Sequence, residues 1–120
     1  MTNDSTYKGS CHCGAVTYEV TMHPPAQANA CNCSICSRAG WLLAFAGGDA
    51  FRLLSGEEML TDYQFHHKHI HHYFCRNCGI HSFSRGTNKD GSPAVSINLR
   101  CLEGIDATQL PVHTFDGASL

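Results

Sequence analysis

Cys31-Asn32-Cys33-Ser34-Ile35-Cys36 places three thiols within six residues of the backbone. Thiols crowded at this spacing are most often there to bind a metal ion. Two further cysteine pairs lie at a distance, one in Cys11-His12-Cys13 and one in Cys75-Arg76-Asn77-Cys78. The three thiols of the first stretch can reach one ion from a single turn, so the two pairs are left to meet each other.

The seven sulfur atoms therefore divide into a set of four and a set of three. Zinc sites that only hold a fold are usually closed by four protein ligands, whereas catalytic sites keep three and leave one position for water or substrate. We expect two Zn²⁺ per chain, one of each kind. The structural ion is predicted on Cys11, Cys13, Cys75 and Cys78, and the catalytic ion on Cys31, Cys33 and Cys36.

A disulfide framework is the alternative interpretation of eight cysteines in 120 residues. Residues 1–6 are polar and no apolar run follows them, so they predict no signal peptide. We therefore expect a cytoplasmic protein, and in a reducing compartment clustered cysteines bind metal or do chemistry more often than they form bridges. Cys-x-Cys and Cys-x-x-Cys partners are also poorly placed to bridge locally. Metal binding is favoured.

The composition suits one small globular domain covering residues 1–120. Hydrophobic residues make up 42% of the chain and charged residues 15%, and 120 residues is a common size for a single compact unit. The net charge of -2 gives no general attraction to nucleic acid or to an anionic membrane. No apolar run reaches the roughly 18 residues that a spanning helix needs. Partners must be inferred from the cysteine sites, and the oligomeric state is left open.

Alternating apolar and polar residues predict a mainly β protein of short strands. In the segment 15–20 this pattern puts Val16, Tyr18 and Val20 on one face of a strand. A frayed tail is expected before Gly9, a loop from Met22 to Cys31, and a helical turn over 33–40 ending at Gly40. Further strands are predicted over 41–46, 51–54, 60–65, 79–85 and 95–101, with a helical turn over 106–110.

Histidines crowd the segment 66–72, which leads into Tyr73-Phe74 and the Cys75 pair. On an extended strand His67, His69 and His71 face one side and His66 and His72 the other. A third metal site on this run is conceivable. The favoured interpretation is a solvated or interfacial strand whose charge responds to pH near about 6.5.

The three-thiolate cluster carries the predicted chemistry. Three anionic sulfurs make zinc a poor generator of hydroxide but suit it to holding a further thiolate, and a zinc-bound thiol is deprotonated at neutral pH. We expect addition of an external thiol to a carbonyl compound, whose oxygen the ion also polarises.

A fourth protein ligand would close the second site and remove this chemistry. Cys101, His12, His72 and His81 are the candidates in the sequence. In that case the chain is a non-catalytic structural zinc module that binds a macromolecular partner.

The cysteine motifs and their flanks resemble the glutathione-dependent formaldehyde-activating enzyme family, also called the centromere protein V type domain. The resemblance is carried by segments spread over nearly the whole chain, namely Gly9-Ser10-Cys11-His12-Cys13-Gly14-Ala15-Val16, Cys31-Asn32-Cys33-Ser34-Ile35-Cys36, Phe74-Cys75-Arg76-Asn77-Cys78-Gly79-Ile80-His81, Asn98-Leu99-Arg100-Cys101-Leu102 and Phe115-Asp116-Gly117.

The resemblance implies a mainly β, Mss4-like fold with zinc knuckles and a core over about 7–117. It also implies structural zinc on the four-cysteine set and catalytic zinc on the three-cysteine set. The activity named for the family is condensation of formaldehyde with glutathione to S-(hydroxymethyl)glutathione, a carbon-sulfur lyase reaction. A small thiol and an aldehyde are thus the expected partners.

Overall fold

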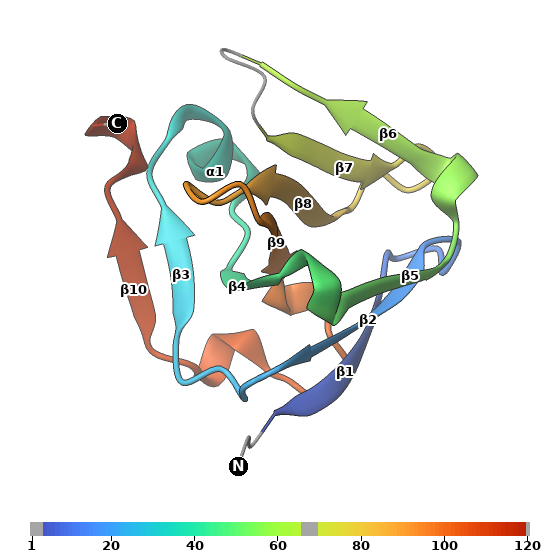
Figure 1. Cartoon of the computed structure of the whole chain (residues 1–120), viewed down its shortest axis with the longest axis horizontal. Coiled ribbons are helices and arrows are strands. Elements are labelled where there is room, and N and C mark those ends of the chain that lie inside the picture. The colour runs from blue at the N-terminus through green and yellow to red at the C-terminus, as the bar shows by residue number, and fades with distance from the viewer. Residues whose placement is uncertain (1–3, 66–69, 120) are drawn as a thin grey trace.

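The computed structural model describes residues 4–65 and 70–119 and confirms a mainly β protein built of two sheets. Figure 1 shows the two sheets, with the short α-helix beside strand β3 of the larger one. The smaller sheet has the strand order β1-β2-β5 and the larger one β10-β3-β4-β9-β8-β7-β6. Because strands far apart in sequence are neighbours, the set of Cys11, Cys13, Cys75 and Cys78 depends on the complete fold.

The smaller sheet is antiparallel and consists of β1 (Ser5–Ser10), β2 (Thr17–Met22) and β5 (Phe51–Ser55). The expected frayed tail before Gly9 is wrong for residues 5–8, because β1 pairs with β2 along its full length, and residues 1–3 lie outside the described residues. A Cβ at Gly9 would stand 2.5 Å from the Tyr18 ring, so β1 lies directly on a core side chain.

Seven strands form the larger sheet: β3 (Ala28–Cys31), β4 (Leu43–Gly47), β6 (Leu60–Tyr63), β7 (His71–Cys75), β8 (His81–Thr87), β9 (Pro93–Asn98) and β10 (Val112–Phe115). All neighbours are antiparallel except β10 and β3, which are parallel. The predicted loop before Cys31 is confirmed over 23–27 and wrong over 28–31, which β3 occupies. The parallel pair places Phe115 opposite Cys31.

Among the described residues, helical structure is limited to α1 (Ser34–Ala39) and five 3₁₀ turns, η1 (Gly48–Ala50), η2 (Glu57–Met59), η3 (Leu99–Cys101), η4 (Ala107–Gln109) and η5 (Gly117–Ser119). The predicted helical turn over 33–40 is confirmed by α1, which ends at Gly40 with a φ of 68°. The strand predicted over 95–101 stops at Asn98, because the Asn98 side chain accepts a hydrogen bond from the backbone N–H of Arg100.

The core lies between the two sheets. Val16, Tyr18 and Val20 are fully buried, as their alternation predicts. Ile97 on β9 and Leu99 just after it are also fully buried and belong to the same core cluster. The cysteines Cys11 and Cys75 belong to the same cluster of buried residues, so the four-cysteine set is part of the core.

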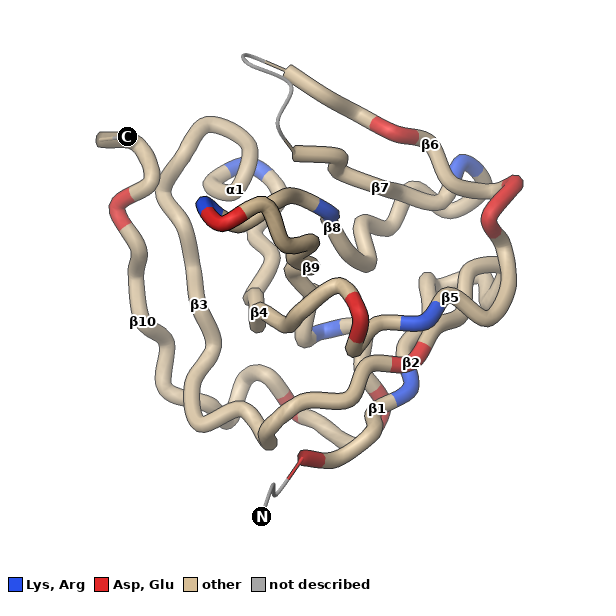
Figure 2. The backbone as a smooth tube through the Cα atoms, in the orientation of Figure 1, with Lys and Arg blue, Asp and Glu red and all other residues tan. Residues whose placement is uncertain are grey.

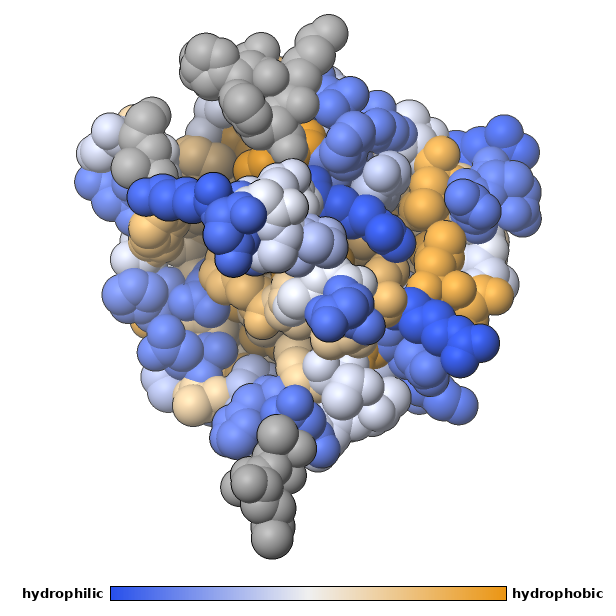
Figure 3. All heavy atoms as spheres, in the orientation of Figure 1, coloured by the Kyte–Doolittle hydropathy of each residue, from blue (hydrophilic) through white to orange (hydrophobic). Residues whose placement is uncertain are grey.

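Charged residues of both signs are interspersed along the backbone (Figure 2). Figure 3 shows apolar surface in strips between polar side chains on the visible face. Within residues 4–65 and 70–119, no helix is long and apolar enough to cross a membrane.

Candidate metal centres

Two tight turns position the four-cysteine set. The turn between β1 and β2 carries Cys11 and Cys13, and the turn between β7 and β8 carries Cys75 and Cys78. In the second turn the Gly79 N–H donates to the Cys75 carbonyl at 2.7 Å. Gly79 has a φ of 78°, a left-handed conformation that glycine adopts without steric cost. The chain can therefore reverse while both sulfurs of the pair stay on the inner side.

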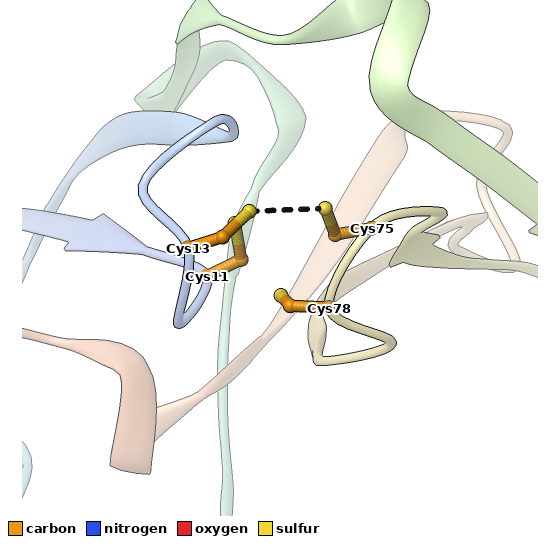
Figure 4. A group of neighbouring side chains, drawn as sticks. All are labelled: Cys11, Cys13, Cys75 and Cys78. Carbon is orange, nitrogen blue, oxygen red and sulfur yellow. Dashed lines mark hydrogen bonds between the residues drawn. The ribbon is translucent and has the colours of Figure 1, made fainter.

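The four sulfur atoms of Cys11, Cys13, Cys75 and Cys78 lie within 4.8 Å of one another and converge on one point (Figure 4). The Sγ atoms of Cys11 and Cys13 are 3.6 Å apart, as are those of Cys13 and Cys75. Four thiolates bound to one zinc at about 2.3 Å have separations of about 3.8 Å, so the residues fit the ion. A disulfide needs about 2.05 Å, and all eight cysteines are free.

The surroundings of these thiols shift their pKa values in different directions. Burial raises the pKa of Cys11 to about 11, whereas the backbone N–H of Cys13 leads the interactions that lower the pKa of Cys78 to about 6. The Asn77 side chain is the main group that lowers the pKa of Cys13. Because a buried thiol resists ionisation, a divalent cation is what would hold the complete set as thiolates.

The three-cysteine cluster lies at the junction of β3 and α1. Cys31 ends β3, Cys33 is the residue before α1, and Cys36 lies on the first turn of α1. The three Sγ atoms lie within 4.8 Å of one another. Three thiolates at this spacing fit zinc with one coordination position left for another ligand.

Backbone and indole N–H groups face these sulfur atoms. The Cys33 N–H donates to Cys31 Sγ at 3.5 Å. Burial opposes ionisation of Cys33, but hydrogen bonds from the Cys36 backbone N–H and from the Cys36 and Cys31 thiols, with a smaller part from the Ile35 N–H, together lower its pKa. Burial raises the pKa of Cys36 to about 12, and the nearby Trp41 indole opposes that rise. The buried Trp41 Nε1 makes no hydrogen bond of ordinary geometry.

The C-terminal segment clasps the three-cysteine cluster through Asn32. The Asn32 Nδ2 donates to Asp116 Oδ1 at 2.9 Å, and its Oδ1 accepts from the Ala118 N–H at 2.9 Å. A Cβ at Gly117 would stand 2.5 Å from Cys31 Sγ. The cluster is therefore held against a backbone segment that leaves no room for a side chain.

The predicted alternatives for a fourth ligand lie elsewhere. Within the described residues, the two groups with metal-binding spacing include none of them. His12 is exposed, and Cys101 Sγ lies 4.0 Å from the His81 carbonyl. The His72 ring stacks on Trp41 with centroids 5.9 Å apart, and the His81 ring meets Trp41 edge-on at 5.2 Å. Both imidazoles therefore pack on the Trp41 indole.

The histidine run is described in part, since the predictions for His66, His67 and His69 lie outside the described residues. His71 Nδ1 lies 2.7 Å from Asp62 Oδ2 on β6. Of the two alternatives, a solvated or an interfacial strand, the solvated one is wrong for His72, which is buried, and burial lowers its pKa. Among the described residues, neither His71 nor His72 belongs to a group with metal-binding spacing.

A cleft of about 610 Å³ is lined by Ser34 and Ile35, the two residues between Cys33 and Cys36, while the cysteines themselves do not line it. One wall is α1, with Ser34, Ile35, Arg38 and Ala39. The facing wall comes from β7, β8 and the end of β6, with Tyr63, Phe65, Phe74 and His81. A volume of this size is typical of small-molecule sites.

The sequence predicts both cysteine sets, but it does not identify the residues that contact the three-cysteine set. The sequence predicts Trp41 only as an ordinary residue of an apolar run. The orientation of an indole N–H leaves no pattern in the sequence. Asn32 and Asp116 are 84 positions apart. The one signal that pointed to the C-terminal segment is its Asp-Gly pair.

Comparisons with known proteins agree with these motifs. A family model described as "Glutathione-dependent formaldehyde-activating enzyme" matches residues 6–116. A Halomonas elongata protein named "Putative glutathione-dependent formaldehyde-activating enzyme" is 36% identical over 61 residues, which are 48% of this chain and 39% of that protein. The crystal structure of a Rhodobacter sphaeroides protein superposes with a TM-score of 0.76 and 36% identity, over 88% of this chain and 99% of the other.

Proposed function

Because the chain belongs to the glutathione-dependent formaldehyde-activating enzyme family, we propose that it joins a small thiol, glutathione or a close analogue, to formaldehyde in a zinc-dependent reaction. The observation that carries this proposal is the three-cysteine cluster with no fourth ligand among the described residues. We further propose that residues 1–120 act as one zinc-binding domain.

The two cysteine sets are assigned different roles. Cys11, Cys13, Cys75 and Cys78 would hold a structural zinc that joins the β1–β2 turn to the β7–β8 turn. Cys31, Cys33 and Cys36 would hold the second zinc, which when bound supplies the positive charge that keeps a guest thiol ionised at neutral pH. Of the two sets, only the three-cysteine set would leave a coordination position for a substrate, so the reaction would take place there.

The proposed reaction needs no oxidant and no second cofactor. The thiol loses its proton, its sulfur adds to the carbonyl carbon, and one C–S bond forms. The electron pair of the C=O π bond moves to the oxygen, which takes up a proton. The product is S-(hydroxymethyl)glutathione when the thiol is glutathione, and the reverse steps release formaldehyde.

The residues of this chain would contribute by position and by charge. The Trp41 indole stabilises negative charge on Cys36 Sγ, and the Asn32 hydrogen bonds fix the backbone that carries Cys31 and Cys33. The adjacent cleft gives the organic part of a substrate a place beside the cluster. These contacts are formed within the folded chain, so the site is pre-organised.

The decisive experiment measures exchange between free formaldehyde and S-(hydroxymethyl)glutathione at equilibrium by NMR with ¹³C-formaldehyde. Formaldehyde adds to thiols spontaneously, so the rate is compared between the wild-type protein, Cys33→Ser protein and no protein. We expect faster exchange with the wild-type protein alone. Equal rates in all three samples would remove the enzymatic proposal and leave a structural zinc module.

Cys101→Ser is the matched control for this assay. Cys101 is a free thiol outside both groups with metal-binding spacing, so its replacement removes one sulfur without touching a proposed ligand. We expect the wild-type exchange rate from this variant. A loss of rate as large as that of Cys33→Ser would contradict the assignment of the three-cysteine set.

A further inference from the structure

The cleft beside the three-cysteine cluster has one aromatic wall. Phe65 stacks on Tyr63 with centroids 5.8 Å apart and an interplanar angle of 21°. Phe65 also stacks on His72 at 5.5 Å and 26°, and His72 stacks on Trp41 at 5.9 Å and 11°. Ring contacts therefore connect the cleft to the buried Trp41 indole.

The outer end of this row is open to a ligand. Tyr63 is 49% exposed, although it lies on the cleft wall with the partly buried Phe65 and Phe74. Aromatic rings that are already stacked and still exposed offer a flat surface for another ring. This wall therefore favours a planar apolar group over a flexible polar chain.

The facing wall supplies one positive charge. Arg38 is the only Lys, Arg, Asp or Glu among the described residues that line the cleft. Its Nη1 donates to the Ser34 carbonyl at 2.8 Å, which fixes the guanidinium, and a guanidinium has further N–H donors. A negative group on the ligand gains from this charge, and a positive group finds no carboxylate on the wall.

We propose that this cleft binds the organic part of an aromatic aldehyde that carries a negative charge, with the ring against Tyr63 and Phe65 and the charge toward Arg38. The inference rests on the proposed function, because it takes the neighbouring cluster to be the place where the carbonyl reacts. Formaldehyde has no group that reaches these walls. The ammonium group of glutathione lacks a carboxylate partner among the described lining residues.

Binding can be measured without any reaction. The zinc-loaded protein is titrated with 4-methylbenzoate, which has the ring and the charge but no carbonyl group to attack, while the fluorescence of the single tryptophan, Trp41, is followed. We expect saturable binding. Binding is then compared between 4-carboxybenzaldehyde and 4-(trimethylammonio)benzaldehyde, which share the ring and differ in the sign of their charge. We expect the anion to bind about threefold more tightly or better, as for a partly exposed ion pair.

Two variants separate the ring contact from the charge contact. Tyr63→Ala should weaken both aldehydes by about fivefold, the size of an aromatic pair contact. Arg38→Ala should abolish the preference for the anion and leave ring binding in place. The matched controls are Phe45→Ala, which removes a ring that is 65% exposed on β4, and Arg52→Ala on β5. Both controls should bind like the wild-type protein.

The inference is overturned if 4-methylbenzoate does not saturate, or if the controls lose as much affinity as Tyr63→Ala and Arg38→Ala. Its failure is distinct from failure of the proposed function. Accelerated formaldehyde exchange without binding of the aromatic anions removes the inference alone. If the aromatic anions bind and Tyr63→Ala and Arg38→Ala weaken that binding, the inference is supported. This holds even if formaldehyde exchange is not accelerated and the proposed function is wrong.

Discussion

The side-chain amide of Asn32 donates to Asp116 Oδ1 at 2.9 Å and so joins the three-cysteine cluster to the C-terminal segment. Asp116 is held in turn by Ser119, whose hydroxyl donates to Asp116 Oδ2 at 2.6 Å. The backbone repeats the connection, because the Asn32 N–H donates to the Phe115 carbonyl at 3.2 Å. Asn32, which lies between the proposed metal ligands Cys31 and Cys33, is thus held in place by the C-terminal segment.

Removing this clasp should weaken the second zinc site and spare the first. We expect Asp116→Ala to lower zinc affinity at the three-cysteine cluster by about 10- to 100-fold, as for other residues that orient metal ligands. The number of bound ions, measured by elemental analysis after dialysis against a weak chelator, should fall from two toward one. Asp106→Ala is the control, since Asp106 makes equivalent hydrogen bonds to Thr108 in η4. Retention of both ions by Asp116→Ala would contradict the role given to the clasp.

Gly117→Ala should damage the same site by a steric route. The added methyl group would stand 2.5 Å from Cys31 Sγ, so either the sulfur or the C-terminal backbone must move. We expect preferential loss of the second ion, seen as faster zinc release to a chromogenic chelator. Ala118→Ser, one position further on, should release zinc at the wild-type rate. Equal release rates for Gly117→Ala and the wild-type protein would show that the close approach has no consequence for the metal.

Local patterns in the sequence predict many of the strands. The strands that they do not predict share a physical cause. Val16, Tyr18 and Val20 alternate, and their strand is predictable because alternation reports a half-buried surface. In contrast, β3 and β10 are four residues each, and β10 is exposed throughout. Their pairing is decided by contacts across more than 80 residues, which leave no local periodicity. The clasp at Asn32 was missed for the same reason.

The two cysteine sets should differ in their importance for folding. Cys75 is 1% exposed and belongs to the core cluster, so Cys75→Ser removes a proposed zinc ligand and leaves a hydroxyl in the core. Structural zinc contributes on the order of 10 kcal/mol in small modules, which is comparable to the whole stability of a domain. We expect Cys75→Ser to lose cooperative thermal unfolding and Cys36→Ser to keep it, as followed by circular dichroism. Unfolding of both variants would remove the distinction between a structural and an open site.

Acid should destabilise the fold partly through His72. Burial lowers the pKa of His72 below its ordinary value of about 6.5. The unfolded chain therefore binds the proton first, and this contribution to stability, complete above pH 6.5, is lost as the pH falls toward the lowered value. His72→Gln should reduce the slope of unfolding free energy against pH between about pH 7 and pH 5. An identical slope for His72→Gln and the wild-type protein would exclude His72 as the source.

The number of sulfur ligands per zinc tests the difference between the two sites most directly. X-ray absorption at the zinc edge gives the mean coordination of the two-zinc protein. We predict about 3.5 sulfur atoms per ion, because four and three are shared between two ions, rising to about 4 when the substrate thiol is added. Four sulfur atoms per ion before the thiol is added, or an unchanged value after saturation with it, would contradict an open three-cysteine site.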